Sequence, residues 1–202
     1  MAFRSHIAVL RFLDQGRLQM PPGAIWSEFP ILENNKTKTM DATDSQDMIP
    51  FRETVRTEWI DYNGHMNLAY YVLVFDHATD DLLDHIGMDE AYRDANGGSA
   101  FVVEAHVTYE NEALEGDDLS VTTQVLDFDA KRMHVFHRMT LEGSDETIAT
   151  NELMFLYVDM NTRRSASIPR SIWGKLNNLR ESQKSRPKPK QAGRSIGIRR
   201  KA

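Results

Sequence analysis

Residues 61–86 read DYNGHMNLAYYVLVFDHATDDLLDHI, a polar turn that runs directly into a long apolar helix. Asp61 stands just before an Asn-Gly turn, and Asn67 is of a residue type that caps helices. A helix start carries free N–H groups and the positive end of the helix dipole, so it attracts a negative oxygen. A carboxylate beside it is placed to act on a carbonyl as general base or nucleophile. The same residue types also suit an ordinary turn and cap.

The helix is predicted over residues 68–86. Its apolar positions recur at three- and four-residue spacing, and they are Leu68, Val72, Phe75, Ala78, Leu82 and Ile86. Gly87 is a suitable C-terminal stop. Another face carries Asp76, Asp80, Asp81 and Asp84. Asp81 lies four residues from both His77 and His85, a spacing that suits a metal, but we interpret this face as solvated and predict no metal site.

Alternating patterns predict the rest of the domain. Strands are expected over 51–58, 101–110, 119–128, 131–141 and 147–158, and a second helix over 170–180. Short linkers between the strands indicate antiparallel hairpins. Alternation in the second of these strands places Phe101 on one face with Val107 and Tyr109, and Glu104 on the other. A long helix needs a broad sheet to cover it, so we predict an α+β fold with a curved antiparallel sheet wrapped around one central helix.

The composition is that of an ordinary globular protein. The chain has 202 residues, 41% hydrophobic and 27% charged, and it has no cysteine, which excludes disulfides, thiolate metal sites and cysteine nucleophiles. The net charge of −6 is uneven: residues 184–202 hold eight basic side chains and no acid, which leaves 16 basic against 30 acidic side chains in 1–183. An acidic body argues against nucleic-acid binding, and no apolar run is long enough to span a membrane.

The two ends differ from the middle. Residues 1–49 are predicted to be a poorly ordered extension, residues 50–182 the folded domain and residues 183–202 a basic disordered tail. An Arg-bearing targeting peptide at the N-terminus and a start at Met40 or Met48 are the alternatives for the first segment. The tail could bind nucleic acid, an anionic membrane or phosphates, and a solubilising role is the default.

The turn, the helix and the strand order over roughly residues 51–160 resemble the hotdog-fold acyl-CoA thioesterases, in the 4-hydroxybenzoyl-CoA thioesterase-like branch. Asp61, Gly64 and the run from Asn67 to Tyr71 stand at that branch's acid, turn glycine and helix start. Asn63 to Asn67 is more similar to the Asn-x-His-x-Asn pattern of fatty-acyl thioesterases, and Glu115-Gly116-Asp117 is a turn typical of hotdog proteins. Trp59 stands where many relatives have a second acid, which leaves Asp61 as the single candidate.

A narrower resemblance concerns the substrate. Trp59 to Asp84, Phe101 to Tyr109 and Asp129 to Arg132 are similar to thioesterases linked to carnitine degradation, which are associated with or fused to carnitine dehydrogenase. That resemblance implies hydrolysis of betainyl-CoA to glycine betaine and CoA. It implies no cofactor.

The resemblance also implies roles for the turn residues. Asp61 attacks the thioester carbonyl or activates water, and both routes stay open. The backbone N–H of Leu68 matches the oxyanion donor. Asn63 and His65 are candidates to donate hydrogen bonds to Asp61 or to position water, although Asn63 also suits a plain turn and His65 a structural role.

A quaternary ammonium acyl group binds to aromatic faces. The candidates for its pocket are Trp59, Tyr62, Tyr70, Tyr71 and Phe101, with Asn67 as a further substrate contact. Core packing explains any one of these aromatics equally well. Lys131 and Arg132 are candidates to bind the CoA phosphates across a subunit interface, and plain surface charge is the alternative.

By resemblance we expect a cytoplasmic homodimer or dimer of dimers that binds acyl-CoA, neither nucleic acid nor membrane, and that is linked functionally to carnitine dehydrogenase. One alternative is a hotdog hydratase or dehydratase, disfavoured because those enzymes usually place an acid and a His five residues apart or on separate helices, whereas Asp61 and His65 are four apart. The other is a non-catalytic acyl-CoA-binding domain, which would bind its ligand without turnover.

Overall fold

The computed structural model describes residues 12–13, 17–18, 50–198 and 200. Within the predicted extension over 1–49, it describes a two-stranded antiparallel pair, β1 (Phe12–Leu13) with β2 (Arg17–Leu18). The rest of that prediction, and the end of the tail at 199 and 201–202, lie outside the described residues. No helix in the described part of the chain is long and apolar enough to cross a membrane.

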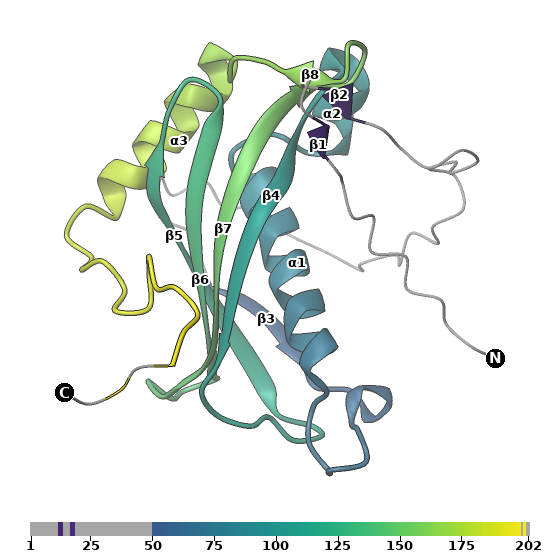
Figure 1. The fold of residues 1–202 in the computed structure, drawn as a ribbon, viewed down its shortest axis with the longest axis vertical. Coiled ribbons are helices and arrows are strands. Elements are labelled where there is room, and N and C mark those ends of the chain that lie inside the picture. Colours follow the sequence, from purple (N-terminus) through teal and green to yellow (C-terminus); the bar gives the residue numbers. More distant parts are fainter. Residues whose placement is uncertain (1–11, 14–16, 19–49, 199, 201–202) are drawn as a thin grey trace, which may run out of the picture.

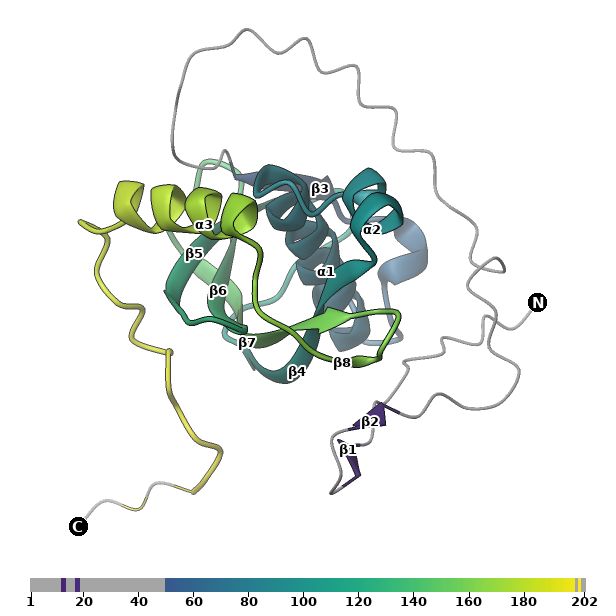
Figure 2. The same cartoon turned by 90° about the horizontal axis from the view of Figure 1, so that it is seen from above.

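A single sheet curves around a long helix, α1 (Figures 1 and 2). Its strand order is β3-β5-β6-β7-β4, with β8 paired to β7, and all of its pairings are antiparallel. The strands are β3 (Phe51–Thr54), β4 (Gly98–Tyr109), β5 (Asp118–Phe128), β6 (Arg132–Leu141), β7 (Thr147–Asp159) and β8 (Arg164–Ser165). The predicted α+β fold is confirmed.

Helix α1 (Leu68–His85) ends one residue short of its predicted bound. Its C-terminus is closed by two backbone hydrogen bonds, from the Gly87 N–H to Asp84 O at 3.0 Å and from the Met88 N–H to Leu83 O at 2.7 Å. Gly87 has φ of +78°, in the left-handed region that this closure requires. The predicted glycine stop is therefore confirmed.

The buried face of α1 differs in part from the predicted stripe. Phe75, Ala78 and Leu82 are fully buried, as predicted. Leu68 is 63% exposed and Val72 is 39% exposed. The apolar stripe that the spacing indicates is therefore buried along the later turns of the helix, whereas one side of the first turns stays open.

The first predicted strand was too long. β3 pairs with β5 from Phe51 opposite Val121 to Thr54 opposite Asp118, where β5 begins. Beyond Thr54 the chain has no strand to pair with, and it turns into a 3-10 helix, η2 (Thr57–Trp59). The other four strands and the second long helix, α3 (Arg170–Ser182), agree with prediction to within three residues.

A β-bulge changes the faces of β4. Val102 pairs with Phe155 of β7 and Glu104 with Met154, so Val103 has no partner of its own. The extra residue reverses the alternation. Phe101 and Glu104 consequently lie on the same face of the sheet, and the prediction that they face opposite ways was wrong.

The sequence did not predict the short helix α2 (Glu90–Asn96), which is polar and lacks apolar periodicity. The Asp89 side chain caps it by accepting the Tyr92 N–H. The Tyr92 hydroxyl hydrogen-bonds to that of Tyr157 at 2.7 Å, which ties α2 to the sheet.

The core extends beyond α1 to α3, whose Ile172 and Leu176 pack in one cluster with Leu82 and Ile86. Residues 183–198 form no helix or strand. Gln183 is nevertheless buried, and its side chain hydrogen-bonds to two backbone groups of β5. The disorder expected over 183–202 and the predicted domain bounds stay predictions.

Candidate active site

Asp61 lies in a tight turn that closes on itself. Ile60 and Met66 form an antiparallel bridge at the base of the turn. The Asp61 N–H donates to His65 O at 3.1 Å, and the Gly64 N–H donates to Asp61 O at 3.0 Å. Gly64 has φ of +86°, a conformation that side chains disfavour. The turn therefore fixes the backbone from which the carboxylate projects.

The Asp61 carboxylate is partly exposed, and its Oδ1 accepts the Asn63 N–H at 2.8 Å. Within the described chain Oδ2 accepts no hydrogen bond. The group thus combines a fixed position with one free oxygen, as a base or nucleophile needs.

The start of α1 leaves one N–H free. The Asn67 side chain accepts the Ala69 N–H at 3.0 Å, and its carbonyl accepts the Tyr70 N–H at 2.9 Å, so Asn67 is the predicted cap. Among the described residues the Leu68 N–H has no acceptor. Because Leu68 is also well exposed, this N–H is available to an oxygen from outside the protomer.

Trp59 ties the two parts of the site together. Its carbonyl accepts the Asn67 N–H at 2.9 Å, and Met66 within the loop donates its N–H to Ala113 O at 2.8 Å. Trp59 is two residues before Asp61, and Asn67 is one residue before Leu68. These bonds therefore hold the carboxylate and the free N–H on one closed loop.

The predicted aromatics do not form one cage within the protomer. Trp59 is buried and stacks on Tyr70, with ring centroids 5.4 Å apart and an interplanar angle of 15°. Tyr71 is buried too, and its hydroxyl accepts the Ala113 N–H at 3.0 Å. Tyr62 is 97% exposed. The structure therefore gathers these four aromatics around the turn but assigns two of them to the core.

An apolar surface surrounds the free N–H. Besides Leu68 and Val72, it includes Tyr109 at the end of β4, whose hydroxyl donates to Leu68 O at 3.4 Å. The Tyr109 ring meets Tyr71 edge-on at 5.4 Å. Desolvation raises the pKa of both tyrosines, so they stay neutral at physiological pH. Such a surface suits the uncharged part of a ligand.

Farther along α1 the surface becomes acidic. Asp76 and Asp80 lie one turn apart, and their pKa values are raised mainly because the surrounding protein desolvates them. Asp76 adds to the effect on Asp80 by repulsion, whereas Arg93 opposes it. A cationic group bound nearby would relieve this repulsion.

His65 gains a partner that the sequence did not indicate. Its Nε2 lies 3.6 Å from Glu112 Oε1, with the imidazole about a third exposed and Glu112 largely exposed. Asn63 is exposed, and only its backbone bonds Asp61. One acid among several in a polar linker carries no pattern that would have singled out Glu112, and Tyr109 was assigned only to a strand face.

Comparison with known proteins identifies the family of this chain. The family model described as the thioesterase-like superfamily matches residues 55–176, which include the turn, α1 and the sheet strands β4 to β7. The chain belongs to this superfamily. The hotdog thioesterase resemblance of the sequence is thereby confirmed.

Two curated members of the superfamily are similar over most of this chain. The betainyl-CoA thioesterase of Pseudomonas aeruginosa PAO1 is 40% identical over 154 residues, which are 76% of this chain and 97% of that protein. The L-carnitine dehydrogenase/betainyl-CoA thioesterase of Agrobacterium fabrum is 41% identical over 68% of this chain, but the match spans only 28% of that longer protein.

Two solved structures share the fold. A putative thioesterase from Pseudomonas putida KT2440 is 39% identical, with a TM-score of 0.67 over 76% of this chain and 98% of that one. A hypothetical protein from Staphylococcus aureus, solved in complex with CoA, is 32% identical, with a TM-score of 0.70 over 74% of this chain and 94% of that one.

Phe101 lies far from the turn within the protomer of this thioesterase-like chain. It stands near the start of β4, eight residues before Tyr109, which corresponds to about 26 Å of strand. Because Tyr109 is the β4 residue that contacts Leu68, a protomer alone does not bring Phe101 to Asp61.

Lys131 and Arg132 are also remote. They follow the far end of β5, whereas Asp118 at its near end pairs with β3, and the strand between spans about 33 Å. The Arg132 guanidinium is engaged by Asp129 at 2.5 Å, which holds the pKa of that carboxyl at about 2. Lys131 is exposed.

Proposed function

We propose that this chain is an acyl-CoA thioesterase that hydrolyses betainyl-CoA to glycine betaine and CoA. The observation that carries the proposal is the 40% identity that extends over 97% of the Pseudomonas aeruginosa betainyl-CoA thioesterase. The carboxylate and the free helix N–H on one closed loop supply chemistry that fits a thioester carbonyl.

In the proposed mechanism the thioester oxygen accepts the Leu68 N–H at the positive end of α1. Charge that develops on this oxygen in the transition state is stabilised there, and such a donor contributes about 3–4 kcal/mol. Asp61 acts on the carbonyl carbon by one of two routes. As a general base it takes a proton from water, whose oxygen forms the new C–O bond as the C–S bond breaks and CoA leaves as thiolate.

As a nucleophile, Asp61 instead forms the C–O bond itself and releases CoA thiolate, leaving a mixed anhydride. Water then hydrolyses that anhydride to free Asp61 and the carboxylic acid product. The free Oδ2 suits either route, and we propose that His65, whose Nε2 lies 3.6 Å from Glu112, orients the water.

The cationic acyl group is supported by charge as well as by similarity. Asp76 and Asp80 make the exposed helix flank beyond the apolar surface negative, and desolvation by the surrounding protein raises the pKa of both carboxyls. A quaternary ammonium cannot be neutralised by losing a proton, so an acidic flank favours it over a neutral acyl group.

We propose that the active form is a homodimer built by pairing the β4 edges. β4 pairs only with β7 in the described chain, and Val102 and Val103 on this edge are 40% and 41% exposed. Apolar strand edges of this length rarely stay unpaired. Antiparallel pairing about the middle of β4 would bring the partner's Phe101 to the end of the β4 edge that holds Tyr109, on the other face of the sheet.

The same pairing would place the partner's Lys131 at the end of the sheet where Asp61 lies, as a CoA phosphate contact requires. A dimer of dimers is the next possible level of assembly.

A lysine in the middle of the β4 edge, in the variant Val103→Lys, should leave the chain folded but monomeric in sedimentation. A dimer unchanged by this variant would overturn the proposed interface.

The names of the relatives support a metabolic setting. The fused Agrobacterium protein combines an L-carnitine dehydrogenase with a betainyl-CoA thioesterase in its name. We therefore propose that this chain works in the cytoplasm in functional association with a carnitine dehydrogenase. The absence of cysteine is compatible with that reducing compartment.

The test is thiol release from betainyl-, acetyl-, benzoyl- and medium-chain acyl-CoA by the native protein, by Asp61→Asn and by Asp84→Asn. Asp84 is an exposed acid near the other end of α1 and serves as the matched control. We expect preferential betainyl-CoA turnover that Asp61→Asn abolishes and Asp84→Asn leaves unchanged.

Preferential turnover of another acyl-CoA would retain the mechanism and refute the substrate. Binding of CoA thioesters without any release of thiol would refute the enzyme and indicate an acyl-CoA-binding domain.

A further inference from the structure

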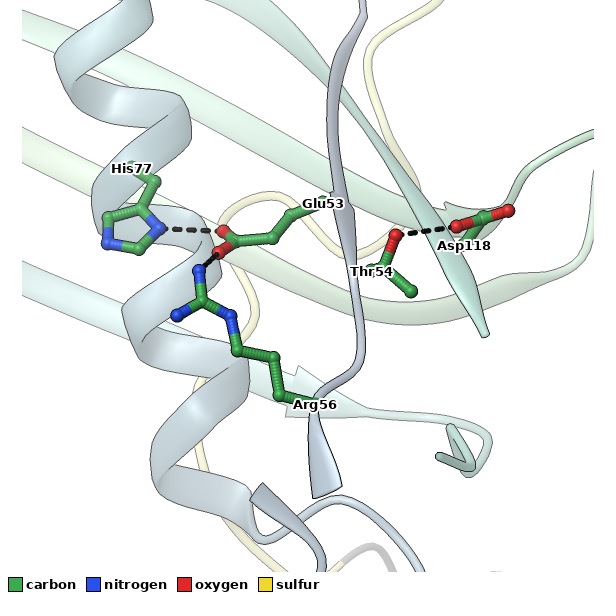
Figure 3. Close-up of polar contacts among 5 residues, drawn as sticks. All are labelled: Glu53, Thr54, Arg56, His77 and Asp118. Atoms are coloured by element: carbon green, nitrogen blue, oxygen red, sulfur yellow. Dashed lines mark hydrogen bonds and ion pairs between the residues drawn. The ribbon is translucent and has the colours of Figure 1, made fainter. Parts of the chain in front are cut away.

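A polar network on β3 lies outside the proposed chemistry. Figure 3 shows Glu53 between His77 of α1 and Arg56. One carboxylate oxygen lies 2.6 Å from His77 Nδ1, and the other accepts the Arg56 guanidinium at 2.9 Å. Only 11% of the Glu53 side chain is exposed. Because water is largely excluded, these bonds hold their geometry more firmly than surface ion pairs do.

The network reaches the active-site loop through Arg56. The Arg56 guanidinium lies over the Trp59 ring, 5.0 Å from its centroid, and the Arg56 carbonyl accepts the Trp59 N–H at 3.0 Å. The Tyr70 ring also stacks on the Trp59 ring. Glu53 therefore fixes the cation that packs on the indole.

Trp59 in turn controls both catalytic groups. Its carbonyl bonds the Asn67 N–H, next to the free Leu68 N–H, and the chain reaches Asp61 two residues later. A tilt of Trp59 would move Asp61 relative to Leu68. Misplacement of a reacting group by about 1 Å can cost a factor of about 100 in rate.

We infer that Glu53 is a positioning residue for catalysis, acting through Arg56 and Trp59 to set the distance between the Asp61 carboxylate and the Leu68 N–H. This inference rests on the proposed function. Glu53 itself touches none of the reacting groups. Its action should therefore show in the chemical step and leave substrate binding nearly unchanged.

The structure offers a matched control on the same strand. Thr54 follows Glu53 and points the other way, where its hydroxyl donates to Asp118 at 2.7 Å (Figure 3). Glu53→Gln and Asp118→Asn each neutralise one carboxylate that is hydrogen-bonded at β3. Only the first of these carboxylates is connected to Trp59.

The experiment measures kcat, KM and the thermal midpoint of both variants, using the acyl-CoA that the native protein turns over fastest. Glu53→Gln should lower kcat about tenfold with KM within about twofold, because the amide replaces one of the two accepting oxygens by an NH2 group, which cannot accept from His77 or Arg56. Asp118→Asn should keep the native kcat. An equal fall of kcat in both variants, or an unchanged kcat in Glu53→Gln, would overturn the inference while leaving the enzyme assignment intact.

Arg56→Gln provides a second variant if Glu53→Gln does not fold, since the Arg56 side chain is 46% exposed. It should lower kcat by a similar factor, and the double variant should lose no more than either single one. If the losses of kcat in the two single variants added up in the double variant, Glu53 and Arg56 would act separately, and the proposed chain of contacts from Glu53 through Arg56 to Trp59 would be contradicted. A native protein without thioester turnover would refute the proposed function, and the positioning role with it.

Discussion

The two ends of α1 are built in opposite ways. At its C-terminal end the glycine closure satisfies two backbone N–H groups, and Ile86 and Met88 are 0% and 2% exposed. At its N-terminal end the Leu68 N–H has no acceptor in the described chain, and the Leu68 side chain is 63% exposed. One helix is thus sealed where it supports the fold and open where a ligand can bind.

This contrast assigns separate tasks to residues that share one helix. Changes at the open end should alter turnover and spare the fold, and changes at the sealed end should do the reverse. The middle of α1 contacts a buried histidine, His137, and acid should therefore lower the stability of this region. Each expectation below tests one of these positions.

The largest effect is expected from Leu68→Pro. Proline has no N–H, is tolerated at the first position of a helix and needs an extended residue before it. Asn67 already has φ of −64° and ψ of 142°. The variant should fold normally while kcat falls about 100- to 1000-fold, as for loss of an oxyanion donor. Steady-state kinetics with circular dichroism checks this, and Leu68→Ala, which keeps the N–H, should retain most of the activity.

At the sealed end, Ile86→Ala should reduce the free energy of unfolding by about 3 kcal/mol, because it leaves a cavity between α1 and α3. The kcat of the folded fraction should stay native. Urea unfolding measures the first quantity and thiol release the second. Leu73→Ala, at a partly exposed position of the same helix, should cost far less. A variant that lost kcat but not stability would contradict the division of tasks.

The middle of α1 should be sensitive to acid. His137 on β6 is fully buried, 3.1 Å from Thr79 of α1 and 2.9 Å from Thr123 of β5. Thr79 donates its own proton to Phe75 O, so it accepts from His137 Nε2–H. Burial lowers the pKa of His137 to about 3.

The unfolded chain, with a His pKa of about 6.5, binds this proton more readily than the folded one. The contribution of His137 to the free energy of unfolding is therefore complete above about pH 6.5 and falls as the pH drops toward 3. The loss should be about 2 kcal/mol at pH 5. Chemical unfolding at pH 7 and pH 5 gives this difference, and it should shrink in His137→Gln. An equal loss in both proteins would assign the acid sensitivity to other groups.

The smallest effect is expected from Asn67→Ala. Loss of the side-chain bond to the Ala69 N–H should cost about 1 kcal/mol of stability. The backbone bond between Asn67 and Trp59 survives, so kcat should change little compared with Leu68→Pro. Asn67→Asp should restore stability. A large fall of kcat in Asn67→Ala would show that the cap, and with it the open end, has a direct catalytic part.

Local signals explain most of what the sequence predicts. The Asn67 cap, the Gly87 stop and the hairpins depend on neighbouring residues, so a single chain contains them. The same is true of the turn that presents Asp61 beside the helix start. The apolar spacing of α1 does not show that Leu68 and Val72 are exposed, because it identifies apolar residues but not whether the sheet reaches them.

The remaining errors concern long-range geometry. The bulge at Val103 depends on how β4 meets β7, and alternation along one strand cannot reveal it. The Glu112 partner of His65 and the Glu53 network join segments that are distant in sequence. Phe101, Lys131 and Arg132 were predicted because their side chains suit the substrate that the resemblance implies, and a sequence does not show how far apart such residues lie in the protomer.

Gln183 has a consequence for polymerisation. On one side of β5, the four residues of β3 pair with its first residues. Farther along the same strand, the Gln183 side-chain amide hydrogen-bonds to the backbone, donating to Thr123 O and accepting from the Val125 N–H at 2.9 Å each. A sheet with two long edges of unpaired backbone N–H and C=O groups can grow into a fibre, as stacked strands do in amyloid. Blocking one side leaves β4 as the long edge for joining, and self-pairing there uses it up. In the proposed β4-edge dimer, growth would then stop at two copies, because the Gln183 amide blocks the opposite side.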